Sequence, residues 1–348
     1  MGHSVMFLMK QLSAALAWLG RRGTRAIAAI VFVAIALPPL DALLKPFVTE
    51  AIFALLAIAF LRVDLGVLRG YLDRPTLVLL ATLWSSVVLP SLFGAGCLLV
   101  GLDTRSPGLF LGVMLQALAS PMMAAPAFAA LMGLDSTLVL SALVASTALT
   151  PLTAPFFAYV FIGPALTLAP LALGLKLLTL LAGSLLVALV IRRLVGVVVI
   201  RRYAPQLDGL NILLVFIFVA AVMENVAGQF LAAPGELIGL LVLAFAIFFA
   251  VLAVTACVFA KAGPDRGLAL GLMTSQRNMG LMLAVTGGPT EAGLALLCLR
   301  PVSHLPVTLL ARSAGAAMAN EPTTAADVRG RQLRGGPRVA PLNGLCQG

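Results

Sequence analysis

The stretch LMTSQRNMGLMLAVTGG (residues 272–288) places a glutamine, an arginine and an asparagine in the middle of a long apolar segment. The whole chain is 61% hydrophobic and 10% charged, with a mean hydropathy of +1.10. This composition is typical of integral membrane proteins and excludes an ordinary soluble domain. An arginine at the centre of a bilayer costs roughly 2.5–3.5 kcal/mol even on lenient insertion scales. Arg277 therefore needs a partner or a function within the membrane.

Apolar segments long enough to cross the hydrocarbon core, for which about 20 residues suffice, recur along most of the chain. The sequence predicts an all-α polytopic membrane protein with about ten transmembrane helices. The expected spans are 24–40, 46–62, 76–101, 107–132, 135–162, 167–191, 208–230, 237–260, 266–287 and 292–312, the last with Arg300, His304 and two prolines in its interior.

Lysine and arginine are distributed unequally between the two sets of loops that these spans define. One set, with the N-terminal segment, contains thirteen of them and the opposite set contains two. The thirteen are Lys10, Arg21, Arg22, Arg25, Arg62, Arg69, Arg74, Arg192, Arg193, Arg201, Arg202, Lys261 and Arg266, against Lys45 and Arg105. By the positive-inside rule, the N-terminus is cytoplasmic and the protein is expected in the cell (inner or plasma) membrane.

The spans divide the chain into two halves of similar length. Residues 1–23 form a cytoplasmic amphipathic lead-in, 24–162 hold five spans, 166–312 hold five more, and 313–348 read as a disordered tail. Because each half has an odd number of spans, the second half starts from the opposite face of the membrane. This is the layout of an inverted-topology repeat, which is common in secondary transporters.

The fourth span of each half carries residues that interrupt a helix. Residues 115–133, LQALASPMMAAPAFAALMG, contain Pro121 and Pro126, each of which removes a backbone donor and clashes with the preceding turn. The ninth span is interrupted at 275–278 and by Gly280. Non-helical backbone at membrane depth is tolerated only where protein buries it or where it lines a cavity. We expect the two interruptions to cross in the core and to form the binding site.

Two tracts resemble the bile acid:sodium symporter family and its bacterial relatives. APAFAALMGLDSTLVLSALVASTALTPLTAPFF (125–157) has a proline-broken helix, a Gly-x-Asp turn and a Ser/Thr-rich helix ending in Leu-x-Pro-Leu. SQRNMGLMLA (275–284) is similar to the family's Gln/Arg-Asn-x-Gly-Leu signature. The resemblance implies ten helices in a panel domain and a core domain, with the two broken helices crossing in the core.

The resemblance also implies transport of an organic anion, either bile acid- or sterol-like or another small organic acid. Sodium-coupled members have a glutamate about one turn before the signature, where this chain has Leu272, Met273 and Thr274. Coupling to Na⁺ or to H⁺ therefore stays open. Arg277 could supply as a fixed charge what Na⁺ supplies elsewhere, through its forked guanidinium.

The candidate site consists of polar and helix-breaking residues near the two interruptions and on neighbouring spans. They are Ser120, Pro121, Pro126, Ser146, Thr147, Glu224, Asn225, Thr274, Ser275, Gln276, Arg277 and Asn278. Arg277 has two interpretations, an ion pair with Glu224 or a role linked to substrate or proton. Glu224 either faces the core or is solvated near the outer end of its helix. Thr147 has the alternative of a hydrogen bond to its own helix.

An organic-anion carrier that works by alternating access accounts for these features best. The alternatives are a related ten-helix efflux carrier of the arsenite or auxin type and a membrane protein that transports nothing. An enzyme is not expected, because the only histidines are His3 and His304 and intramembrane carboxylates are few. We expect no cofactor, no metal site and no nucleic-acid partner. The expected partners are a small organic anion and the bilayer. The sequence does not set the oligomeric state.

The C-terminal tract departs from the rest of the chain after Gly288. One back-translation of residues 297–307, shifted by one base, gives Phe-Ala-Phe-Ala-Gln-Phe-Pro-Ile-Tyr-Leu, which resembles the tenth helix of the same family. We therefore hypothesise a frameshift near Gly288, with a non-native tail after it. Sequencing the DNA there tests this, because codons incompatible with the shifted reading would contradict it.

Overall fold

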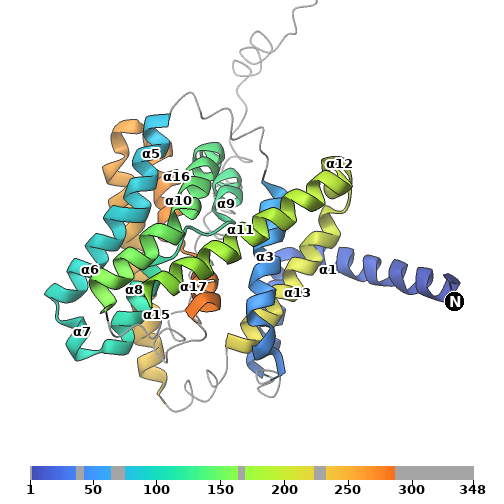
Figure 1. Cartoon of the computed structure of the whole chain (residues 1–348), viewed down its shortest axis with the longest axis horizontal. Helices are drawn as coiled ribbons and strands as arrows, with labels where there is room; N and C mark the ends of the chain where they lie inside the picture. The colour runs from blue at the N-terminus through green and yellow to red at the C-terminus, as the bar shows by residue number, and fades with distance from the viewer. Residues whose placement is uncertain (1, 37–42, 64–74, 164–168, 223–232, 287–348) are drawn as a thin grey trace, which may run out of the picture.

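The computed structural model describes residues 2–36, 43–63, 75–163, 169–222 and 233–286 (Figure 1). These residues are almost entirely helical and contain no strand, only one isolated β-bridge. Five helices among them are long and apolar enough to cross a membrane: Pro75–Leu99, Ser136–Ile162, Pro170–Val195, Ala204–Ala221 and Pro234–Val258. The prediction of an all-α membrane-embedded protein is confirmed at this level. The tenth expected span, 292–312, and the tail, 313–348, lie outside the described residues.

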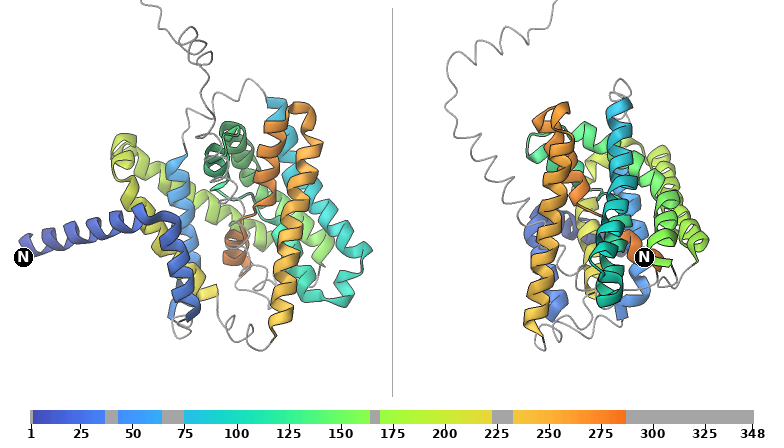
Figure 2. Two further views of the ribbon diagram at one scale, coloured as in Figure 1. Left: turned by 180° about the vertical axis from the view of Figure 1, so that it is seen from behind. Right: turned by 90° about the vertical axis from the view of Figure 1, so that its left-hand side faces the viewer.

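The helices form two groups joined by α11 (Pro170–Val195), as Figures 1 and 2 show. One group contains α1 (Gly2–Ala36), η1 (Lys45–Phe47), α3 (Val48–Arg62), α12 (Val197–Arg202) and α13 (Ala204–Val222). The other contains α5 (Pro75–Leu83), η2 (Trp84–Val88), α6 (Leu89–Leu99), α7 (Leu102–Arg105), α8 (Pro107–Leu118), α9 (Ala125–Leu131), α10 (Ser136–Phe157), η3 (Ala158–Ile162), α15 (Pro234–Val258), η5 (Ala260–Ala262) and α16 (Pro264–Ser275). Helix α11 packs on α3 and on α10, and the short α17 (Met279–Thr286) contacts α3, α8 and α11.

The two predicted interruptions are present, and the two interrupted helices begin alike. Helices α8 and α16 both start with a proline, Pro107 and Pro264, and both are 12 residues long. A proline is favoured in the first turn because the backbone N–H that it lacks has no partner there. Helix α8 stops before Ser120, and the chain resumes as α9 with Pro126 near its start. Helix α16 stops at Ser275 and resumes as α17 after Asn278.

One helix of the second group contains a π-helical turn. The span Pro75–Leu99 runs as α5, then the π-helix η2, then α6. At η2 the N–H of Leu89 donates to the carbonyl of Trp84, five residues earlier, instead of four as in an α-helix. Such a turn contains one extra residue and leaves backbone groups available for other partners, which is why π-turns are frequent at functional sites. Here it brings Ser85 to the helix interruption.

Helix α16 lies very close to α15 because two glycines face it. Gly267 and Gly271 are four residues apart, in the spacing that lets apolar helices approach backbone to backbone. A Cβ atom at Gly271 would lie 2.6 Å from the carbonyl oxygen of Leu252, and one at Gly267 would lie 2.8 Å from that of Ala256. This contact fixes the position of α16 at the end that leads into the interruption.

Two apolar clusters enclose the interrupted region. One joins α5, α9, α15, α16 and the first half of α10, and includes the buried Leu270 and Met273. The other joins α3, α8, α11, α17 and the end of α10, and includes the buried Met279 and Met282. Met123, in the interruption after α8, packs against both clusters. The polar residues of the interruptions therefore lie between two well-packed apolar layers.

Substitution of Gly271 by alanine tests the α15–α16 contact. The added methyl group meets the backbone at Leu252, so we expect Gly271→Ala to lower the free energy of unfolding by about 1–3 kcal/mol. Gly239, on the same α15, has open space around it, so Gly239→Ala should stabilise slightly, by at most about 1 kcal/mol. Melting temperatures in detergent compare the two. Equal effects of the two substitutions would contradict the close approach.

Candidate functional site at the helix crossing

The two interruptions meet backbone to backbone. The N–H of Asn278 donates to the carbonyl of Ser120 at 2.7 Å, and the N–H of Met122 donates to the carbonyl of Gln276 at 2.9 Å. Pro121 and Arg277 form an isolated antiparallel bridge between them. Backbone groups released by a helix break must find partners in a membrane, and here each interruption supplies partners for the other. The predicted meeting of the two interruptions is confirmed.

The guanidinium of Arg277 is buried at this crossing and binds three oxygen atoms. Nη1 donates to the hydroxyl of Ser85 at 3.2 Å and to the carbonyl of Ala119 at 3.1 Å, and Nη2 donates to the carbonyl of Ser85 at 3.0 Å. Only 5% of the Arg277 surface is exposed. Among the described residues these bonds use three of the five N–H donors of an arginine. Nε and one Nη2 hydrogen remain.

Both partners of Arg277 follow from local backbone geometry. Ala119 is the C-cap of α8, where helix carbonyls lack intrahelical N–H donors and carry partial negative charge. Ser85 belongs to the π-turn η2. The guanidinium therefore joins the end of one interrupted helix to the irregular turn of a neighbouring span. No carboxylate pairs with it among the described residues, where Arg62 pairs with Asp208 and Arg266 with Asp135.

Four predicted site residues are buried and have polar side-chain atoms without a hydrogen-bond partner among the described residues. Gln276 is 1% exposed, and neither its amide oxygen nor its amide nitrogen is bonded. The hydroxyls of Ser120, Ser146 and Thr147 are also unbonded. Ser146 and Thr147 lie on α10, which packs against α8, α9 and α16. A buried polar atom without a partner costs about 1–3 kcal/mol, so these atoms, which belong to the interruptions and to the helix that packs against α8 and α16, indicate contact with a ligand or water.

The remaining described site residues are occupied with structural hydrogen bonds. The hydroxyl of Thr274 contacts the carbonyls of Leu270 and Gly271 and the hydroxyl of Thr255. The Thr255 hydroxyl also accepts from the indole N–H of Trp84 at 3.0 Å. The hydroxyl of Ser275 donates to the carbonyl of Leu272. The side chain of Asn278 accepts from the N–H of Leu281 and so caps α17. Thr147 does not bond to its own helix, whereas Thr150 does.

Four residues that hold the predicted site residues were absent from the sequence prediction. Ser85 and the carbonyl of Ala119 bind Arg277, and Thr255, which accepts from Trp84, contacts Thr274. The Ser85–Ser86 pair inside an apolar span was the available signal. Glu224 and Asn225 lie outside the described residues, so the Arg277–Glu224 ion pair stays a prediction.

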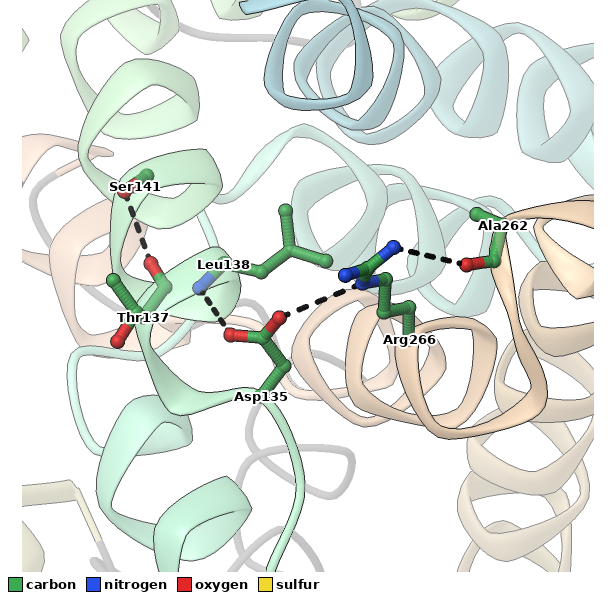
Figure 3. Close-up of polar contacts among 6 residues, drawn as sticks. All are labelled: Asp135, Thr137, Leu138, Ser141, Ala262 and Arg266. Atoms are coloured by element: carbon green, nitrogen blue, oxygen red, sulfur yellow. Dashed lines mark hydrogen bonds and ion pairs between the residues drawn. The ribbon is translucent and has the colours of Figure 1, made fainter. Parts of the chain in front are cut away.

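A second contact ties the same elements together away from the crossing (Figure 3). Asp135 lies just before α10, and one of its carboxylate oxygens accepts from the N–H of Leu138 at 3.0 Å as the N-cap. The other carboxylate oxygen of Asp135 lies 3.7 Å from Nε of Arg266 on α16. Nη1 of Arg266 donates to the carbonyl of Ala262. The Gly-x-Asp turn thus links the start of α10 to the first turn of α16.

The chemistry available at the crossing is that of a fixed positive charge beside neutral donors and acceptors. The described residues contain no group of three or more His, Cys, Asp or Glu that could hold a metal ion. An arginine, a free amide and three hydroxyls suit recognition of a polar or anionic molecule. No protein-family model matches the sequence, and no curated protein matches it either.

Replacement of Arg277 by lysine tests its role at the crossing. One ammonium group cannot replace both Nη1 and Nη2, so at least the bond to the carbonyl of Ser85 is lost, and we expect Arg277→Lys to lower the free energy of unfolding by about 1–3 kcal/mol. Arg192 also donates to a backbone carbonyl, that of Val63, but is partly exposed. Arg192→Lys should change the free energy of unfolding by no more than about 0.5 kcal/mol. A similar loss in both variants would contradict a special role for Arg277.

Two substitutions at Asp135 separate its cap from its ion pair. Asparagine caps a helix as well as aspartate does, and the partly exposed ion pair with Arg266 contributes little to stability. Asp135→Asn should therefore lower the free energy of unfolding by at most about 0.5 kcal/mol. Asp135→Ala removes the cap and should cost about 1 kcal/mol. Thermal melting in detergent measures both. If the asparagine variant loses as much as the alanine variant, the ion pair is the main contribution.

Proposed function

We propose that this chain is a secondary active transporter of a small organic anion that works by alternating access. The observation that carries the proposal is the crossing of two interrupted helices, joined by backbone hydrogen bonds and surrounded by buried polar atoms without partners. Interrupted helices that meet inside the membrane are the usual place for substrate in transporters built from inverted repeats. A structural membrane protein has no need for several uncompensated polar groups at such a place.

The charge at the crossing favours an anion. Arg277 is buried, and no described carboxylate neutralises it. Two of its N–H donors are unused among the described residues, and the neighbouring Gln276 offers both a donor and an acceptor. A carboxylate accepts well from a guanidinium and an amide together. We assign the contacts with substrate to Arg277, Gln276, Ser120, Ser146 and Thr147.

The wider architecture belongs to the same proposal. It comprises ten transmembrane helices in two inverted repeats, a cytoplasmic N-terminus and membership of the bile acid:sodium symporter family. The equal lengths and proline starts of α8 and α16 support the repeat, as does the antiparallel bridge between the interruptions that follow them. The two helix groups correspond to a panel that contains α1, α3 and α13 and a core that contains the crossing.

We further propose that transport does not depend on sodium. A hard cation needs several oxygen ligands, and carbonyls at helix ends are among the usual ones in membranes. At this crossing the carbonyls of Ala119 and Ser85 and the hydroxyl of Ser85 already bind the guanidinium of Arg277. The guanidinium of Arg277 therefore binds oxygens that a Na⁺ ion would need as ligands. Residues 272–274 contain no carboxylate that could add a ligand.

Thermal stability in the presence of organic anions tests the function. The detergent-purified protein is melted with a panel of carboxylates and sterol-like acids, once in sodium buffer and once in choline buffer. A ligand at about 100 times its dissociation constant should add roughly 2.7 kcal/mol to the folded state. We expect a shift with at least one anion, equal in the two buffers. Gln276→Leu should remove it, because the amide is lost.

The control for this experiment is Gln206→Leu. Gln206 also has an unbonded amide oxygen, but it lies on α13, away from the crossing, and donates to Ser13. This variant should keep the shift. A shift that requires sodium would contradict the sodium-independent part of the proposal, and no shift with any anion would contradict the transport of organic anions.

A further inference from the structure

The N-terminal part of α1 leaves the helix bundle. Gly23 has a non-helical conformation with φ 46°, and the helix changes direction there. Before Gly23, the helix projects sideways from the other helices with the N-terminus at its far end, as both Figure 1 and Figure 2 show. After it, the chain runs beside α13. This projecting part, residues 2–22, is called the N-terminal arm below.

One side of the N-terminal arm is covered where it meets the bundle. Gly20 and Gly209 of α13 let the two backbones touch, since a Cβ atom on either would overlap the other helix. Ala17 is buried, and the amide of Gln206 donates to the hydroxyl of Ser13 at 3.4 Å. The side chains on the opposite side of the arm have no such cover.

The uncovered side combines aromatic and cationic residues at helical spacing. Phe7 and Trp18 are 64% and 52% exposed and stand eleven residues apart, which is close to three full turns, so they share one face. Lys10 and Arg21 are exposed and have the same spacing, and their face lies about 60° from the first. Arg22 stacks on Trp18, with its guanidinium carbon 4.3 Å from the ring centre.

The charge of the N-terminal arm has one sign. The sequence contains no aspartate or glutamate before Asp41, whereas Lys10, Arg21, Arg22 and Arg25 all precede it. Tryptophan beside arginine is the combination found at the membrane–water boundary, where the ring lies at headgroup level and the cation reaches phosphate. A helix with exposed apolar residues, aromatic rings and unneutralised cations matches an anionic lipid surface in shape and in charge.

We propose that the N-terminal arm lies in the plane of the membrane on an anionic leaflet. Trp18 and Phe7 enter the headgroup region, and Lys10, Arg21 and Arg22 bind lipid phosphates. Gly23 permits the change from the in-plane arm to the part of α1 beside α13, because its φ lies where other residues are strained. The occupant of the uncovered face is lipid, and neither a protein partner nor a second copy of the chain is needed.

Trp18 reports directly on this contact. The chain has two tryptophans, so Trp84→Phe leaves Trp18 as the only one. This variant is reconstituted in nanodiscs of phosphatidylcholine alone or with about one quarter phosphatidylglycerol, with lipids brominated near the headgroup end of the acyl chains. We expect these lipids to quench Trp18 emission by roughly half, and more strongly with the anionic lipid than without it.

Charge reversal supplies the matched comparison. Lys10→Glu with Arg21→Glu should remove the dependence on phosphatidylglycerol, whereas Arg105→Glu with Lys261→Glu, two cations outside the arm, should preserve it. Trp18 that is quenched by acrylamide in water but not by brominated lipid would overturn the proposal. So would lipid quenching that is equal in the two membranes and unchanged by charge reversal, which would indicate apolar insertion without recognition of anionic lipid.

Discussion

The bond between the Arg277 guanidinium and the carbonyls of Ala119 and Ser85 holds together three parts of the fold. It reaches from the interruption after α16 to the C-terminal end of α8 and to the π-turn of a neighbouring span. Each partner would be an unsatisfied backbone group without it, and such groups are expensive inside a membrane. The positive charge of Arg277, in the middle of an apolar segment, is therefore stabilised on one side by hydrogen bonds to backbone oxygens.

The sequence predicted the helices and both interruptions well, because they rest on short-range chemistry. Long apolar runs predict spanning helices, and Pro121 and the polar run at Gln276 predict breaks. The prediction that the breaks meet rests on the symmetry of the layout, and the backbone hydrogen bonds from Asn278 to Ser120 and from Met122 to Gln276 confirm it. Met279 and Met282 are buried in an apolar cluster, as expected of soft packing side chains.

The partners within the site were harder to predict, because they depend on contacts between residues far apart in the chain. Arg277 and Ser85 are 192 residues apart, and no local pattern connects them. Pro90, in the first turn of α6, follows the π-turn and removes one backbone donor, but a proline alone does not show which distant side chain will bind Ser85. Which hydroxyls are bonded also depends on tertiary packing: Thr150 donates to its own helix, whereas the neighbouring Thr147 has no such bond.

The backbone pairing at the crossing has a consequence for how such a site can change during evolution. The two hydrogen bonds that join the interruptions use only main-chain atoms of Ser120, Met122, Gln276 and Asn278. Side chains at these positions can therefore be exchanged while the crossing itself is retained, subject to their fit. At these four positions the crossing depends on main-chain atoms, whereas the substrate contacts that we propose for Ser120 and Gln276 depend on their side chains.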